Sequence, residues 1–292
     1  MVEMKSEAEI AHMREAGLVV ARTLRTVSAA VAPGVTTGEL DEIAEESIRA
    51  AGAVPSFLGY QGFPACICTS VNDEVVHGIP STERVLRDGD VVSIDCGAII
   101  DGWHGDAAVT VAVGEVSGEL QTLMETTETS LWRGLAVARP GGRLVDIGRA
   151  VEDTVRAAGT YGIPREYGGH GIGTAMHQEP FVANYATRRG GASRRLEPGL
   201  VLAVEPMVTL GTHRSRVLDD EWTVVTRDGS YAAHFEHTVA VTERGPWVLT
   251  AFDGGRQLLG DAYGGPAEAD AGNDVDNATA GASPGLAGDD VR

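Results

Sequence analysis

The same short pattern occurs twice in the sequence, once in each half of the chain. In LRDGDVVSID and LEPGLVLAVE, a turn with a central glycine leads into an apolar, β-branched run. The run ends on one carboxylate, which is Asp95 in the first copy and Glu205 in the second. Asp106 and Glu236 then open alternating runs that are typical of β-strands. The repeat predicts two related halves, each with two carboxylates borne on strands.

Helical and strand patterns are grouped along the chain, which predicts an α+β fold rather than a doubly wound sheet. Capping-box patterns at Ser6 and Thr36 indicate the starts of the first two helices. We expect helices over residues 6–31, 36–52, 117–138 and 144–158, and strands over 65–71, 91–100, 107–113, 200–209, 223–227 and 237–242.

The composition divides the chain into one folded domain over residues 1–252 and a tail over residues 253–292. The tail is acidic and rich in Gly, Ala and Asp, with few large apolar residues. Such a segment cannot bury enough apolar surface to offset the entropy of ordering, so we expect it to be disordered.

The net charge and the cysteines limit the classes of function. A formal charge of −19 without a contiguous basic stretch argues against nucleic-acid binding. The charged start MVEMKSE is no signal peptide, and no apolar run is long enough to span a membrane. Cys66, Cys68 and Cys96 make no disulfide framework, which favours a reducing compartment. We therefore expect a cytoplasmic protein, and nothing indicates an obligate dimer, so we expect a monomer.

The repeated carboxylates point to a cation site. Asp95 and Glu205 each end an apolar run, where an ionised carboxylate is costly without a cation or several donors. Any one of these acids could instead accept backbone hydrogen bonds or pair with an arginine. Four acids in a repeated arrangement favour divalent metal, because crowded carboxylates otherwise raise one another's pKa values. Paired divalent ions can share a hydroxide, which is a nucleophile for hydrolysis.

Among the histidines, His170 is best suited to this site, because the glycines of GGHGIG let the backbone pack close to a ligand. One imidazole among carboxylates favours Mn, Fe, Co or Zn over Ca. His77 and His177 could be hydrogen-bonding or proton-transfer groups, or simply turn histidines. His234 is a lesser candidate that shares a strand face with Glu236. The remaining histidines are expected to be surface or structural: His12, His104, His213 and His237.

Together these motifs resemble those of the bacterial type I methionine aminopeptidases. The resemblance covers about residues 4–249, with motifs in order and at compatible spacings, and it does not cover the tail. The matching pieces are MREAG at 13–17, NDEVVHGIP at 72–80, GDVVSID at 89–95, GDA at 105–107, GHGIG at 169–173, HQEP at 177–180, EPM at 205–207 and EHT at 236–238.

The resemblance implies a pita-bread fold, in which a pseudo-two-fold relates two helix-and-strand halves. It also implies two divalent metal ions, with Asp106 and Glu236 bridging both ions, Asp95 on one and His170 on the other. Glu205 completes the implied ligand set. The residues alone do not select among Mn, Fe, Co and Zn.

The implied reaction is removal of the initiator methionine from nascent polypeptides whose second residue is small. A metal-bridging hydroxide would attack the scissile carbonyl, and Glu205 would pass its proton to the leaving amine. His177 would stabilise the oxyanion, and His77 would contact the scissile amide nitrogen. The methionine side chain is expected in an apolar pocket whose residues could otherwise be plain core: Phe57, Phe63, Cys68, Met176 and Trp222.

The resemblance makes nascent polypeptide N-termini the substrate and implies the ribosome as a further partner, although the negative charge gives ribosome binding no support. Two alternatives remain open. An Xaa-Pro aminopeptidase shares the fold, but it carries a long extra N-terminal domain and a differently spaced ligand set. A catalytically silent relative would use the fold as a binding module, and intact acids at all four repeated positions argue against that.

Overall fold

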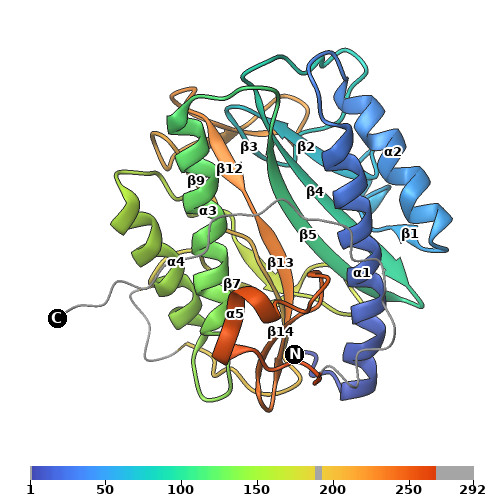
Figure 1. Cartoon of the computed structure of the whole chain (residues 1–292), viewed down its shortest axis with the longest axis vertical. Coiled ribbons are helices and arrows are strands. Elements are labelled where there is room, and N and C mark those ends of the chain that lie inside the picture. The colour runs from blue at the N-terminus through green and yellow to red at the C-terminus, as the bar shows by residue number, and fades with distance from the viewer. Residues whose placement is uncertain (1, 188–192, 268–292) are drawn as a thin grey trace.

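The structure is a computed structural model that describes residues 2–187 and 193–267 (Figure 1). The helices are α1 (Glu7–Ala30), α2 (Thr37–Ala50), α3 (Gly118–Ala136), α4 (Leu144–Ala158) and α5 (Arg256–Leu259), with short 3₁₀ turns at Tyr60–Gly62 and Gly260–Ala262. The strands are β1 (Val54–Pro55), β2 (Ile67–Val71), β3 (Glu74–Val76), β4 (Val91–Ile100), β5 (Trp103–Ala112), β6 (Gly169–Gly171), β7 (Gln178–Val182), β8 (Val201–Val204), β9 (Met207–Thr209), β10 (Ser215–Val217), β11 (Val224–Thr226), β12 (Ala232–His234), β13 (Glu236–Thr242) and β14 (Gly245–Val248).

A nine-stranded sheet forms the centre of the fold, and its two halves meet in the middle. The strand order is β1-β4-β5-β13-β8-β6-β7, with β2 paired to β4 and β14 paired to β13. β5 and β13 join the halves where Ala108 lies opposite Glu236. α1 and α2 lie beside the β4–β5 half, and α3 and α4 lie beside the β8–β13 half (Figure 1). The two related halves confirm the expected α+β, pita-bread arrangement.

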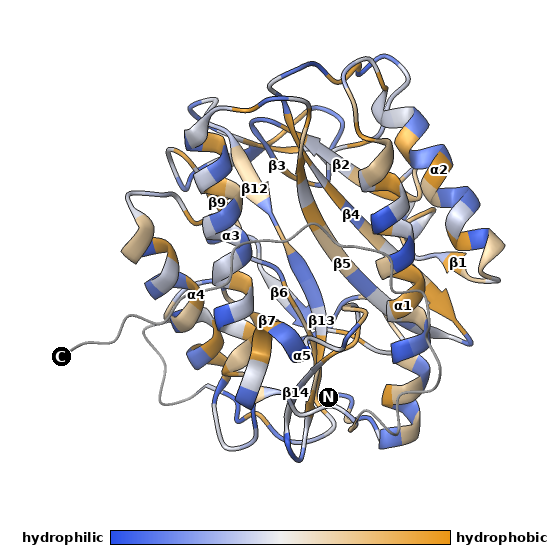
Figure 2. Ribbon diagram, in the orientation of Figure 1, coloured by the Kyte–Doolittle hydropathy of each residue, from blue (hydrophilic) through white to orange (hydrophobic). Residues whose placement is uncertain are grey.

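Side-chain alternation along β4 separates the core from the site. Ile94 and Cys96 are fully buried in the cluster that includes residues of α1 and α2. Asp95, between them, therefore points to the opposite face of the sheet. In Figure 2 each of α1 to α4 carries both apolar and polar residues, as expected of helices with one packed and one exposed face. The helices thus occupy one face of the sheet and leave the other to the carboxylates.

Both predicted capping boxes are confirmed. The Ser6 hydroxyl accepts from the backbone N–H of Glu9, and the Glu9 carboxylate accepts from the Ser6 N–H at 2.7 Å. Thr36 and Glu39 repeat this arrangement at α2. Each box satisfies backbone donors that the first turn of a helix leaves free. Among the described residues, no helix combines the length and apolarity needed to cross a bilayer.

The strand expected over residues 200–209 is wrong in one respect, since the structure divides it in two. β8 ends at Val204, and β9 pairs with β12 in a separate two-stranded sheet. Pro206 lies in the gap and cannot donate a ladder hydrogen bond. Glu205 therefore sits where the chain leaves the main sheet. β6 and β7 were not predicted. The sequence of β6, Gly-His-Gly, has no alternation of apolar and polar residues.

The boundary of the predicted disordered tail needs correction. Arg256–Leu259 forms α5, and Leu259 is buried in the core beneath α3. The guanidinium of Arg244 donates to the carbonyl of Gly265 at 2.6 Å. Residues 253–267 thus belong to the packed fold, because a few apolar anchors hold a segment otherwise made of small residues. The rest of the expected tail, residues 268–292, lies outside the described residues.

Two neighbouring leucines test this correction. Leu259 is 6% exposed and Leu258 is 57% exposed. We expect Leu259→Ala to lower the free energy of unfolding by about 2 kcal/mol or more, because it empties a packed position. Leu258→Ala, the matched control, should stay within about 0.5 kcal/mol of the parent protein in urea titrations. Equal effects of the two substitutions would show that α5 does not dock as described.

Candidate active site

One cavity of about 200 Å³ gathers every side chain that the sequence singled out for chemistry. It is lined by the five expected ligands, by His77 and His177, and by the expected apolar residues: Phe57, Phe63, Cys68, Met176 and Trp222. Tyr60 and Gln61 also line it, and the sequence reasoning had assigned them no role. These side chains come from both halves of the fold, so the site depends on the junction of the halves.

Four strands or strand ends deliver the carboxylates. Asp95 lies on β4 opposite Cys68, and Asp106 lies on β5 opposite Gly97. Glu236 begins β13, and Glu205 follows the last residue of β8. Their placement follows from strand register, so each carboxylate is fixed by the backbone rather than by a flexible loop.

A buried threonine joins the two strands that carry the central acids. Thr238 on β13 donates its hydroxyl to the carbonyl of Asp106 at 2.8 Å, and its oxygen accepts from the Asp106 N–H at 3.1 Å. Thr238 is fully buried. These two hydrogen bonds hold β5 against β13 next to the carboxylate cluster.

The distances within the cluster suit a bound cation. Asp106, His170 and Glu236 each offer one ligand atom, and these atoms all lie within 4.8 Å of one another. Nε2 of His170 is 3.6 Å from Oδ2 of Asp106 and 3.7 Å from Oε1 of Glu205. One buried oxygen on each of Asp95, Asp106 and Glu236 has no hydrogen-bond partner within the described protein. Buried acceptors of this kind are costly unless a cation or a donor meets them.

The tautomer of His170 strengthens this argument. Its Nδ1 lies 3.0 Å from the carbonyl oxygen of Gly171, which can only accept, so Nδ1 carries the proton. Burial lowers the pKa of His170 to about 3, so the ring is neutral at pH 7. Its Nε2 therefore presents a lone pair to two carboxylates. Lone pair and carboxylate would repel each other without a cation between them, so the donor set fits divalent metal.

The carboxylates themselves hold protons when no cation neutralises them. Burial raises the pKa of Asp95 to about 7, and burial together with the charge of Asp95 raises that of Glu205 to about 8. Burial, followed by the neighbouring acids, raises the pKa values of Asp106 and Glu236 well above their usual range. The fully ionised form of the site is therefore unfavourable unless positive charge is bound there.

Two further histidines face the carboxylates and the pocket. The ring of His177 lies 4.3 Å from that of His170, and its Nδ1 is 2.9 Å from the hydroxyl of Tyr60. His77 sits in a left-handed turn with φ of 62°, and its ring meets Trp222 edge-on. Burial lowers the pKa of both rings, and that of His77 falls to about 4. Both are neutral near pH 7 and able to exchange hydrogen bonds with a substrate.

The expected apolar residues form a cluster separate from the main cores. Phe57, Phe63, Cys68 and Met176 are buried together, and Trp222 packs against them. The rings of Phe63 and Trp222 meet edge-on at 5.1 Å. Because all five residues also line the cavity, the cluster is a wall of the pocket rather than plain core.

Of the remaining histidines, one lies next to the site and others have structural roles. Nε2 of His234 is 3.7 Å from Oε2 of Glu205, so this lesser candidate does reach the centre. His104 is buried and bonded to Ser56, and His237 is bonded to Thr250, as expected for structural histidines.

Comparison with known proteins gives a consistent result. The profile of metallopeptidase family M24 matches residues 11–243. Methionine aminopeptidase 1 of Mycobacterium tuberculosis is 54% identical over 255 residues, covering 86% of this chain and 95% of that protein. The methionine aminopeptidase of Clostridium acetobutylicum is 50% identical over 250 residues, covering 86% and 99%.

Solved structures of methionine aminopeptidases and of an Xaa-Pro dipeptidase share the fold of this chain. The crystal structure of methionine aminopeptidase from Rickettsia prowazekii superposes with a TM-score of 0.83 at 39% identity, covering 86% of this chain and all of that one. The Xaa-Pro dipeptidase from Bacillus anthracis reaches a TM-score of 0.66 at 26% identity, and the match covers 61% of that chain. The fold is thus shared with both kinds of enzyme, but the similarity is much greater to the first.

The raised pKa values predict how stability depends on pH in metal-stripped protein. Asp95 and Glu205 bind more protons in the folded state than in the unfolded state from about pH 4 up to about pH 7 and 8, respectively. The free energy of unfolding should therefore fall as the pH rises through that window. Adding Mn²⁺ at pH 8 should restore much of the loss, because the ion binds only the folded site.

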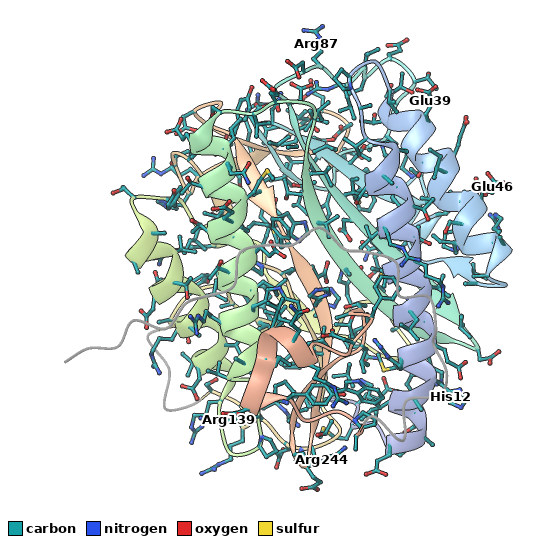
Figure 3. The ribbon with its side chains drawn as sticks, in the orientation of Figure 1. His12, Glu39, Glu46, Arg87, Arg139 and Arg244 are labelled. Carbon is teal, nitrogen blue, oxygen red and sulfur yellow. The ribbon has the colours of Figure 1, made fainter. Side chains whose placement is uncertain are left out.

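Calorimetry at pH 5.5 and pH 8, with and without Mn²⁺, measures this effect. Glu205→Gln removes one titrating group and should flatten the slope. Glu46→Gln is the matched control, because Glu46 projects from α2 into solvent (Figure 3). A metal-free protein that becomes more stable between pH 5.5 and pH 8 would contradict the prediction.

Proposed function

Since the chain belongs to metallopeptidase family M24, we propose that it is a methionine aminopeptidase that removes the N-terminal methionine from polypeptides whose second residue is small. The observation that carries the proposal is the union of two features in one cavity. The carboxylates of the candidate metal centre and a cluster of apolar side chains line the same cavity.

The proposed ligands are Asp95, Asp106, His170, Glu205 and Glu236, and their number suits two divalent ions drawn from Mn, Fe, Co and Zn. Ions bound there would lower the pKa of a water molecule and polarise the scissile carbonyl. Support comes from the unpaired buried oxygens and from the His170 lone pair that faces the acids. Their assignment as ligands is our proposal.

Glu205 is the residue that we expect to move a proton. Its Oε1 faces His170 and its Oε2 faces His234, so it borders both the centre and the open cavity. Its position at the end of β8, rather than within a strand, gives its side chain access to a bound peptide. We expect it to accept the proton of the attacking water and to pass it to the leaving amine.

His177 and His77 would complete the reaction site. Nδ1 of His177 and the hydroxyl of Tyr60 share a hydrogen bond of 2.9 Å, which holds the ring in place. In the tautomer with its proton on Nε2, the ring would accept at Nδ1 and donate from Nε2 to the developing oxyanion. His77, which is held in a left-handed turn and also lines the cavity, would contact the scissile amide nitrogen. The two rings would then contact different atoms of the same peptide bond.

The pocket explains the choice of residue that is released. Aromatic and sulfur-containing side chains make contacts suited to a flexible thioether. The preference for a small second residue is part of the proposal and rests on the similarity to methionine aminopeptidases.

The cellular setting is also part of the proposal. Nascent polypeptide N-termini would be the physiological substrate, the ribosome a further partner, and the enzyme a monomer in the cytoplasm. Support for a reducing compartment comes from Cys66, Cys68 and Cys96, which are free and buried.

Peptide hydrolysis by metal-stripped enzyme tests the proposal. We expect methionine release from Met-Ala-Ser, little release from a Met-Leu peptide and none of alanine from Ala-Pro, with turnover restored by Mn, Co, Fe or Zn. Cleavage of Ala-Pro would instead favour the Xaa-Pro class. Absence of turnover with every metal would favour a binding module.

Tyr60 provides a narrower prediction. Tyr60→Phe removes the hydroxyl that is hydrogen-bonded to Nδ1 of His177 and orients the ring, so kcat on Met-Ala-Ser should fall about tenfold with a small change in KM. Tyr185→Phe serves as the control, because its hydroxyl bonds to the carbonyl of Arg165 and not to a pocket residue. A normal kcat in Tyr60→Phe would show that this contact does not orient His177.

A further inference from the structure

The segment before α1, residues 2–6, belongs to no helix or strand, and we call it the N-terminal strap. It is anchored by its backbone, because the N–H of Lys5 donates to the carbonyl of Gly199 at 2.8 Å. Gly199 forms the turn before β8 with φ of +92°, and a Cβ there would lie 2.6 Å from the carbonyl oxygen of Lys5. The strap is thus fixed to the strand that leads to Glu205.

The side chains of the strap hold a second segment, residues 173–178, which we call the His177 loop. Nζ of Lys5 donates to Oε1 of Gln178 at 3.2 Å, while Nε2 of Gln178 donates to Oε2 of Glu3 at 2.5 Å. At the other end of the loop, the hydroxyl of Thr174 donates to Oε1 of Glu3 at 3.1 Å. Glu3 and Lys5 of the strap therefore form hydrogen bonds with residues near both ends of the His177 loop.

Gly173 is required by this contact. A Cβ on Gly173 would lie 2.5 Å from Oε2 of Glu3 and 2.5 Å from Cε of Lys5. The residue has an ordinary φ, so its lack of a side chain is needed for space and not for backbone conformation. The last glycine of the GHGIG motif is thus explained by the strap and not by the metal centre.

Burial of the charged Lys5 side chain costs free energy of folding. The side chain is 1% exposed, and burial lowers its pKa while Glu3 raises it. The Lys5–Glu3 ion pair is only partly buried, because the Glu3 side chain is 32% exposed. The two partner residues on the loop, Gln178 and Thr174, are held by directed hydrogen bonds that fix geometry.

The loop carries two pocket residues between its held ends. Met176 is buried in the apolar cluster, and His177 lies against His170 and Tyr60. A loop held at Thr174 and Gln178 has few residues left to move, so the strap limits where both side chains can lie.

We propose that the N-terminal strap is a positioning device: Glu3 and Lys5 set the placement of His177 and Met176 relative to the substrate. The proposal rests on the proposed aminopeptidase function and adds residues that touch neither metal ligands nor substrate. Misplacement of a catalytic group by about 1 Å can lower turnover about a hundredfold.

The test uses the full chain loaded with Mn²⁺ and the peptide Met-Ala-Ser. Thr174→Val changes an exposed position and removes the bond to Glu3, so kcat should fall about tenfold while the melting temperature and the metal bound per protein stay unchanged. Thr174→Ser keeps the hydroxyl and should restore kcat. Glu7→Ala is the control, because Glu7 is exposed in the first turn of α1 and contacts no residue of the loop.

Gly173→Ala is the second variant, since its methyl group would push away the flexible ends of Glu3 and Lys5 rather than backbone. It should lower kcat in the same way. Unchanged kcat in both Thr174→Val and Gly173→Ala would overturn the strap proposal, as would losses that follow lost metal or lost stability. An inactive parent enzyme would instead count against the proposed function.

Discussion

The crowding of four carboxylates on one face of the sheet is the constraint on which the rest of this structure depends. Asp106, Glu205 and Glu236 are buried and Asp95 is partly buried, and one buried oxygen on each of Asp95, Asp106 and Glu236 has no hydrogen-bond partner among the described residues. Such a cluster opposes folding unless cations neutralise it. The fold tolerates it because β4 pairs with β5 along its whole length, β13 pairs with β8 over four residues, and the other face of β4 and β5 packs against α1 and α2. The raised pKa values mean that these carboxylates hold protons when no cation is bound, and the donor set fits divalent ions that would replace the protons.

The internal repeat explains how the acids reach one place. Corresponding strands of the two halves meet at β5 and β13, and Thr238 bonds to the backbone of Asp106 across this junction. Elements outside the repeat then give the centre its chemistry. β6 supplies His170, the His177 loop supplies Met176 and His177, and the turn at Tyr60–Gly62 supplies the partner of His177. The four carboxylates thus come from the repeat, whereas the histidines and Tyr60 come from the added segments.

Much of this could be predicted from sequence because it depends on local periodicity. The bounds of β4 and α4 match the predicted ranges, and alternation along β4 correctly separates Asp95 from Ile94 and Cys96. Contacts between distant segments leave no pattern in the local sequence. The hydrogen bonds between Tyr60 and His177 and between Thr174 and Glu3 were therefore not predicted. The break at Pro206 could have been predicted from the missing N–H. The docking of Leu259 could not, because a single apolar anchor in a small-residue segment resembles a disordered composition.

The central claim is that the carboxylates hold protons in the absence of metal and exchange them for divalent ions. The most direct measurement is calorimetric titration of metal-stripped protein with Mn²⁺ at pH 6.5, in two buffers of different ionisation enthalpy. Because the pKa values of Asp95 and Glu205 lie near 7 and 8 without metal, binding should release protons, and the observed heat should depend on the buffer. Asp106→Asn should weaken binding strongly. Absence of binding, or binding whose heat is the same in both buffers, would contradict the account.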